Sequence, residues 1–153
     1  MNILQNKIPP PIVLLLFGSA MWFLAHSEYA GPIVIPYALV VAIVLAVVGA
    51  LIAGSAIRQF RAAETTVNPL KPETASALVQ SGIFGKTRNP MYVGLLLILS
   101  GWAVWLESLS CLGLLLLFVV AITELQIKPE EAAMRKLFGD EYLRYCEKVG
   151  RWI

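Results

Sequence analysis

Four long apolar segments limit what this chain can fold into. They span residues 10–26, 33–57, 90–106 and 109–126, and apart from Glu124 they contain no Asp, Glu, Lys or Arg. The second segment is long enough to cross a bilayer at about 1.5 Å per helical residue, and the other three are slightly short. A soluble domain of this length carries more charge than the 14% found here. We therefore expect an all-α integral membrane protein with about four transmembrane helices in a single domain, residues 1–153.

The basic residues gather in three parts of the chain: the head before residue 12, the section 58–88 and the tail after residue 127. The short turns that follow the first and third apolar segments contain none. Because cytoplasmic loops are enriched in Lys and Arg, this pattern predicts a multi-pass protein with both termini on the cytoplasmic side. Membrane lipids are its expected surroundings, and a net charge of +2 gives no reason to expect nucleic acid as a partner.

Small residues recur every four positions in the second apolar segment, at Ala42, Ala46, Ala50 and Gly54. Side chains at this spacing lie near one another on a helix, and small ones let two membrane helices approach closely. The pattern predicts tight packing against another helix of the chain or, alternatively, a homodimer formed through this face.

A dense polar stretch at residues 78–94 interrupts the apolar pattern with the sequence LVQSGIFGKTRNPMYVG. Pro90 suits the first residue of a helix, where its missing N–H costs little. Asn89 is kept out of helical geometry by Pro90, so we expect its side chain to cap the helix or to turn toward a ligand. Residues 58–80 contain prolines, no Gly and one Ser, which predicts an ordered extended loop folded against the polar stretch.

The tail is predicted to form a final amphipathic helix, which Pro129 opens and Gly139 breaks or bends. It begins with the pair Glu130 and Glu131. Two acids in a first turn stabilise the positive end of a helix by about 0.3–1 kcal/mol. Alternatively, one of the two points into a site as a hydrogen-bond acceptor, and the sequence leaves open which one.

Residues that often carry catalytic or metal chemistry are scarce in this chain. His26 is the only histidine, which argues against a multi-histidine metal site and against a Ser-His-Asp triad. Cys111 and Cys146 are far apart in different contexts, so we expect two free thiols. Tyr142 and Tyr145 are most simply packing residues whose hydroxyls reach water. No metal site is expected.

Five short motifs lie between residue 65 and the C-terminus: TTVNP at residues 65–69, LVQSG at 78–82, RNPMYVG at 88–94, Glu130-Glu131 followed by FGDEY at 138–142, and VGRWI at 149–153. In this order and spacing they resemble the isoprenylcysteine carboxyl methyltransferase family and its prokaryotic relatives. That broad group of membrane methyltransferases also includes phospholipid N-methyltransferase-like and methanethiol S-methyltransferase-like members. The resemblance runs from about residue 60 to the C-terminus.

The resemblance implies an S-adenosylmethionine site without a Rossmann fold, in a cavity built from residues 64–94 and 126–153. The cofactor contacts that it implies are Ser76, Ala77, Leu78, Val79, Phe84, Asn89, Pro90, Met91, Tyr92 and Glu130. The expected catalytic residues are Arg88, Tyr92 and Glu130. Arg88 would pair with the cofactor's carboxylate or hold a loop carbonyl or a lipid phosphate, whereas Glu130 would accept hydrogen bonds from the cofactor. Tyr92 would pack against or hydrogen-bond the bound ligand.

The resemblance also implies a substrate class, and Gln126 and Glu131 are the expected substrate-binding residues. Protein-methylating members have His in place of Asn89, Tyr in place of Phe84 and, in place of Gln126, an Arg linked to the substrate carboxylate. The implied acceptor is a lipophilic carboxylate or thiol of the isoprenylcysteine type that enters from the bilayer. The alternatives are a phospholipid amine and a non-enzymatic membrane scaffold that binds a partner protein. The small size is typical of a minimal catalytic core in a prokaryotic plasma membrane.

Overall fold

The computed structural model describes residues 8–65 and 72–153, and within them the protein is helical, as predicted. Lys7 and residues 66–71, which include most of the TTVNP motif, lie outside the described residues. The main helices are α1 (Pro10–Ala25), α2 (Ala38–Ala62), α3 (Pro90–Trp105), α4 (Cys111–Ile122) and α5 (Lys128–Lys148). Two short 3₁₀ helices, η1 (Pro72–Thr74) and η2 (Gly82–Gly85), precede α3, and a π-helical turn, η3 (Thr123–Ile127), joins α4 to α5.

Two of these helical stretches are long and apolar enough to cross a membrane: α2, and the continuous stretch Cys111–Lys148 that contains α4 and α5. The helices α1 and α3 are also apolar but have 16 residues each. The predicted count of four spans and the predicted orientation therefore stay predictions. The charged helix α5 continues beyond the apolar α4, and we treat α5 as lying outside the membrane.

The helix α2 and the second apolar segment, residues 33–57, differ by five residues at each end. Ile33 and Ile35 precede α2 in an irregular segment, where their backbone N–H groups donate to Glu107, at 2.9 Å to its carbonyl and at 2.8 Å to its carboxylate. Because these N–H groups bind the opposite turn, α2 begins only at Ala38. At its other end α2 continues through Arg58 to Ala62, so the predicted loop starts later than expected.

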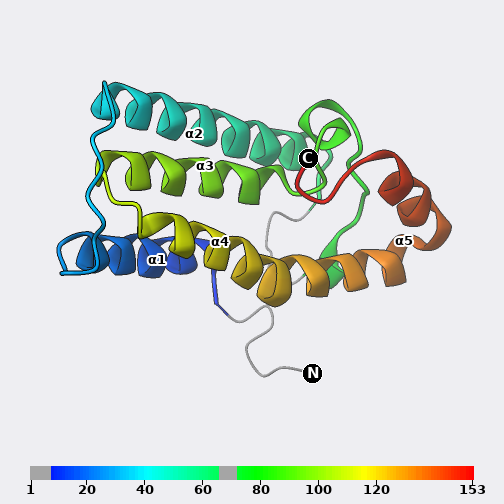
Figure 1. Ribbon diagram of the computed structural model, residues 1–153. Coiled ribbons are helices and arrows are strands. Elements are labelled where there is room, and N and C mark those ends of the chain that lie inside the picture. Colours follow the sequence, from blue (N-terminus) through cyan, green and yellow to red (C-terminus); the bar gives the residue numbers. More distant parts are fainter. Residues whose placement is uncertain (1–7, 66–71) are drawn as a thin grey trace.

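The helix α3 lies beside α2, and the two are in backbone contact (Figure 1). The buried residues of α2 are Ala42, Gly49 and Ala56, which are seven positions apart. A Cβ added to Gly94 on α3 would lie 2.5 Å from the carbonyl oxygen of Gly49, so only glycine fits. Tight packing against another helix of the chain is therefore confirmed.

The small residues that make this contact are not the ones predicted, apart from Ala42. Ala50 is exposed, and a Cβ added to Gly54 would meet no atom within 4 Å. The reason is geometric: a contact stripe between two slightly tilted helices repeats every seven residues, whereas a repeat of four drifts around the helix. The alternative of a homodimer through the predicted face stays a prediction.

Pro129 lies in the first turn of α5, as predicted, but α5 is not separated from the helix before it. The chain passes from α4 through η3 into α5 without a break (Figure 1). The wider π-helical turn just before Pro129 accommodates a residue that lacks an N–H and would clash in a regular α-helix. Gly139 bends α5 as predicted, with a φ of 51°, and the chain then turns back toward the C-terminus.

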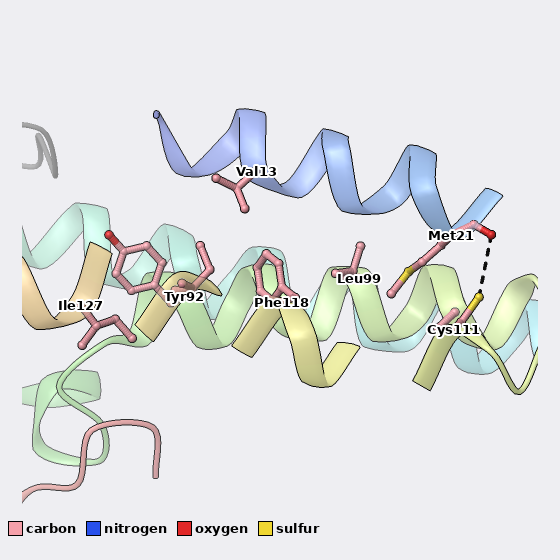
Figure 2. Close-up of a cluster of buried hydrophobic side chains, with 9 residues drawn as sticks. Val13, Met21, Tyr92, Leu99, Cys111, Phe118 and Ile127 are labelled. Carbon is pink, nitrogen blue, oxygen red and sulfur yellow. Dashed lines mark hydrogen bonds between the residues drawn. The ribbon is translucent and has the colours of Figure 1, made fainter. Parts of the chain in front are cut away.

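The hydrophobic core lies where α1, α3 and α4 meet (Figure 2). Phe118 of α4 and Leu99 of α3 are among its fully buried side chains, and the ring of Phe17 on α1 meets Phe118 edge to face at 5.4 Å. Cys111 is buried beside Met21, and both Cys111 and Cys146 are free thiols, as predicted. The same cluster reaches Tyr92 and Ile127, so the core directly supports the residues described next.

Candidate functional site

A cavity of about 450 Å³ lies at the end of the bundle where α1 and α3 begin and α2 ends, which we call the polar end. Segments far apart in the sequence meet around it. Its lining consists of Pro9, Pro10, Pro11, Ala53, Ile57, Phe60, Thr65, Ala75, Ala77, Leu78, Val79, Phe84, Arg88, Asn89, Pro90, Met91, Tyr92, Leu95, Glu130, Glu131, Met134, Tyr142 and Tyr145. The lining is mostly apolar, so its few polar groups determine what the cavity binds.

Tyr92 and Glu130 form the central polar contact of this cavity. Tyr92 lies in the first turn of α3 and Glu130 in the first turn of α5, and the tyrosine hydroxyl donates a hydrogen bond to the glutamate carboxyl. Burial raises the pKa of Glu130 to about 8; the bond from Tyr92 opposes this shift, and the nearby charge of Glu131 adds to it. The cavity thus contains a carboxyl group that a positively charged ligand would ionise.

Glu131 also lines the cavity, but two arginines neutralise it. Its Oε1 accepts from Arg88 Nη2 at 2.8 Å and from Arg151 Nε at 2.9 Å, and its Oε2 accepts from Arg151 Nη2 at 2.7 Å. Burial alone would raise the pKa of Glu131, but these hydrogen bonds and charges outweigh it and hold the pKa below its ordinary value. Both members of the glutamate pair therefore face the site, and Glu130 is the one that these cations do not neutralise.

The polar motif at residues 87–90 holds the end of the chain. Residues 149–153, which we call the C-terminal strap, lie across this motif. The Arg88 guanidinium donates to the carbonyl of Val149 at 2.7 Å, and the Asn89 side chain donates to the carbonyl of Arg151 at 2.9 Å. Asn89 makes no capping bond to α3, so of the two roles predicted for it capping does not occur, and its amide nitrogen binds the strap.

The structure collects most of the site residues that the sequence predicted. Those that line the cavity are Ala77, Leu78, Val79, Phe84, Arg88, Asn89, Pro90, Met91, Tyr92, Glu130 and Glu131. Ser76 does not: it is exposed, and its hydroxyl donates to the carbonyl of Glu64 at 3.0 Å. Gln126 does not either, because it is fully buried in η3 and its amide donates to the carbonyl of Ile8 at 2.7 Å.

Sequence reasoning missed two tyrosines of the cavity wall. Tyr142 and Tyr145 were expected to be packing residues whose hydroxyls reach water, but both are buried and line the cavity. The Tyr145 hydroxyl donates to the carbonyl of Phe84 at 2.7 Å. The available signal was Gly139, because a bend there turns the second half of α5 back toward the polar stretch.

Aromatic rings from four elements line the same cavity as Glu130. Phe60 and Phe84 have ring centroids 4.8 Å apart, and Tyr92, Tyr142 and Tyr145 complete the set. Such a lining suits a ligand with a flat apolar part and a positive charge. Within residues 8–65 and 72–153, no group of three His, Cys, Asp or Glu side chains is placed to hold a metal ion.

A second hollow, which we call the apolar groove, lies along the membrane part of the bundle. It has a volume of about 710 Å³ and is lined by Leu14, Leu15, Gly18, Ser19, Trp22, Phe23, Leu39, Ala42, Ile43, Ala46, Ile98, Leu99, Gly101, Trp102 and Trp105. On α3 the cavity lining ends at Leu95 and the groove lining begins at Ile98, one helical turn further along. On α2 the groove lining ends at Ala46 and the cavity lining begins at Ala53, so the groove is a separate hollow further from the polar end.

Comparison with known proteins assigns the chain to a family. The family described as phospholipid methyltransferase matches residues 37–141, which is more than half of the chain, so the chain belongs to this family. A protein of Haemophilus influenzae described only as uncharacterized is 48% identical over 64 residues, which are 41% of this chain and 100% of that protein. No solved structure matches. The resemblance to membrane methyltransferases is thereby confirmed, and the isoprenylcysteine branch stays a prediction.

Proposed function

We propose that this member of the phospholipid methyltransferase family binds S-adenosylmethionine in the cavity at the polar end and methylates a lipophilic acceptor. One observation carries the proposal: the buried carboxyl of Glu130, held by Tyr92 inside an aromatic cavity. Membership of the family indicates a membrane methyltransferase. The volume of about 450 Å³ lies within the range of small-molecule sites.

The residues of the cavity fit such a cofactor by their chemistry. Glu130 would accept hydrogen bonds and favour the positive charge, losing its own proton on binding. Tyr92 would keep the Glu130 carboxyl in place, and the backbone of residues 77–79 would contribute further polar contacts. When bound, the cofactor supplies a methyl group that is already activated on a positively charged sulfur. The protein therefore needs chiefly to position the acceptor and to exclude water, and little acid–base chemistry is required.

The apolar groove supports an acceptor with a hydrocarbon tail. On α1 the cavity lining ends at Pro11 and the groove lining begins at Leu14, so a tail lying in the groove could direct its polar head toward the cavity. Because lipid and groove are similarly apolar, the binding free energy of the tail would come from close packing rather than from removal of water. This agrees with entry of the acceptor from the bilayer between α1 and α2.

The charges of the site bear on which acceptor is methylated. Arg88 lines the cavity, but its Nη atoms are bound by Glu131 and by two carbonyls, at distances of 2.7–3.1 Å. A carboxylate acceptor would have to compete for these Nη atoms or reach the buried Nε of Arg88, which has no hydrogen-bond partner among the described residues, whereas a thiol or an amine would need neither. This observation favours a second candidate within the same reaction, N-methylation of a lipid amine, for which Glu130 would be the hydrogen-bond acceptor.

Calorimetry with S-adenosylmethionine and detergent-purified protein tests the proposal. Saturable binding is expected for the native protein, and binding about 10- to 100-fold weaker for Glu130→Ala, since a hydrogen bond to a charged group is lost. Glu147→Ala is the matched control, because Glu147 is an exposed glutamate of the same helix outside the cavity. Absence of binding by folded protein in both detergent and lipid would contradict the proposal and favour the non-enzymatic scaffold.

The acceptor is identified by transfer of an isotope-labelled methyl group. Protein that binds the cofactor is supplied in turn with phosphatidylethanolamine, a long-chain thiol and a prenylated cysteine analogue. Label in the amine or thiol product is the expected result. Label in the methyl ester alone would show that Arg88 exchanges its partners during catalysis and would contradict the charge argument.

A further inference from the structure

The C-terminal strap closes the chain over the polar end, and its contacts are specific. The Arg151 carbonyl accepts from Thr87 Oγ1 at 3.3 Å and from Asn89 Nδ2 at 2.9 Å, and the backbone N–H of Arg88 donates to the Gly150 carbonyl at 3.0 Å. Trp152 Nε1 donates to Thr123 Oγ1 of η3 at 3.2 Å. The strap therefore links the start of α3 to the turn that precedes α5.

The side chain of Arg151 makes the strongest of these links. Its guanidinium donates two nearly parallel hydrogen bonds to Glu131, at 2.9 Å from Nε and 2.7 Å from Nη2. Paired bonds of this kind fix direction as well as distance, which a lysine could not do. Arg88 holds the remaining side of the same carboxylate at 2.8 Å. Glu131 is thus fixed from the start of α3 and from the end of the chain.

Fixing Glu131 also fixes its neighbour. Glu130 and Glu131 are consecutive residues in the first turn of α5, directly after the irregular turn η3. A rotation of this turn about the helix axis would carry Glu130 away from Tyr92 on α3. The two arginines oppose such a rotation, and they also offset the charge of Glu131, which would otherwise repel a second carboxylate beside it.

We propose that Arg151 is a positioning residue: by holding Glu131 it presents Glu130 to the cavity, which makes the C-terminal strap a working part of the cofactor site. The identity of the ligand rests on the proposed function, whereas the positioning of Glu130 rests on the geometry alone. Arg151 itself lies outside the cavity lining, so it acts through Glu131.

A double-mutant cycle on cofactor binding tests the proposal. Arg151→Ala is expected to weaken S-adenosylmethionine binding about tenfold, and Arg151→Lys by less, because the charge remains. Arg144→Ala, which removes an exposed arginine of α5, should leave binding unchanged. If Arg151 acts through Glu130, the double variant Arg151→Ala with Glu130→Gln binds no more weakly than Glu130→Gln alone. Fully additive losses would indicate a general structural effect and overturn the proposal.

Hydrogen exchange of the cofactor-free protein provides a measurement that does not depend on the proposed function. Amides of residues 130–134 are expected to exchange about tenfold faster in Arg151→Ala than in the native protein or in Arg144→Ala. Unchanged exchange overturns the proposal, whether or not the protein binds S-adenosylmethionine. If the native protein binds no cofactor but the amides still exchange faster in Arg151→Ala, the positioning role of Arg151 is supported while the proposed function fails. If Arg151→Ala does not fold, Arg151→Lys carries both measurements, with smaller changes expected in the same directions.

Discussion

The two flanks of α3 differ although both are apolar. On one flank Gly94 and Gly101 bring the backbone of α3 against α2, where an added Cβ would lie 2.5 Å from the Gly49 carbonyl and 2.7 Å from that of Ala42. Toward α1, large side chains such as Trp102 line the apolar groove, whose lining also includes Ala42 and Gly101 of the first flank. The first flank is closed at backbone distance, and the second leaves a hollow of about 710 Å³.

Hydrophobicity does not explain this difference, because lipid tails are as apolar as the helices and give them no reason to associate. The difference follows from the size of the residues and from their spacing. Ala42, Gly49 and Ala56 repeat every seven residues and meet the glycines of α3, so the two helices gain van der Waals contact along their length. Where such a register is missing, a lipid chain can occupy the space. The closed flank serves stability, and the open flank is where we propose that the acceptor lies.

The largest effect, on stability, is expected from placing a larger residue at Gly94, where α3 packs against α2. Gly94→Ala should lower the free energy of unfolding by about 1–3 kcal/mol, because its Cβ would press on the Gly49 carbonyl and on the Cβ of Ala53 at 2.9 Å. Unfolding in mixed micelles measures the change. Gly113→Ala on α4 is the control: its Cβ meets no atom within 4 Å, so alanine should stabilise that helix slightly. Equal effects at both glycines would show that the flank is not closed.

A smaller effect, confined to function, is expected from filling the open flank. Gly18 lines the apolar groove, and a Cβ added there meets no atom within 4 Å. Gly18→Leu should therefore raise KM about tenfold for a long-tailed acceptor, since the tail loses packing in the groove, while cofactor affinity is unchanged. Gly113→Leu, an equivalent change outside the groove, should leave KM unaffected. The same KM for short- and long-tailed acceptors in both variants would contradict the assignment of the groove.

The next effect concerns the pH dependence of cofactor binding in the cavity at the polar end. The pKa of Glu130 is about 8 in the cofactor-free protein, and a positively charged cofactor would lower it, so binding releases a proton. Affinity should rise about fivefold between pH 7 and pH 8 and level off above that range. The group facing Glu130 from α3 is Tyr92, and Glu131, bound to Arg88 and Arg151, lies beside it.

Glu130→Gln serves as the control for this pH dependence, because its amide does not titrate and the rise should disappear. Folding stability depends on pH in the opposite direction from cofactor affinity: it falls as the pH rises. Since the folded pKa is raised from 4.5, the contribution of Glu130 to stability is present below pH 4.5 and is lost as the pH rises through about 8. Calorimetry in buffers of different ionisation enthalpy measures the released proton, and a native protein with no proton release would refute the assignment.

The smallest effect is expected away from both flanks. Lys128 and Glu124 form an ion pair with half-exposed side chains at the junction of η3 and α5. Lys128→Ala should change the free energy of unfolding by no more than about 0.5 kcal/mol and leave methyl transfer unchanged, because exposed ion pairs contribute little. A loss above 1 kcal/mol would mean that the junction, rather than the α2 flank, limits stability.

Local patterns predicted much of this molecule. Pro90 begins α3 and Gly139 bends α5, as expected, because each residue restricts or frees its own backbone irrespective of the rest of the chain. The polar stretch was correctly expected to border a cavity. The helix α2 begins at Ala38 and not with the apolar segment at Ile33, because Ile33 and Ile35 bind Glu107, more than 70 residues away, and no local pattern reports such a bond.

The sequence by itself determined the apolar helices, the polar end and the pair of glutamates, since these depend on composition and on neighbouring residues. Only the tertiary structure decided what each polar group binds. Arg88 holds Glu131 and the C-terminal strap, and Glu130 meets Tyr92 inside the cavity. These partners are between 38 and 61 residues apart. Contacts at such separations arise from helix packing and from the turn η3, which set the rotation of each helix and thereby the direction of each side chain.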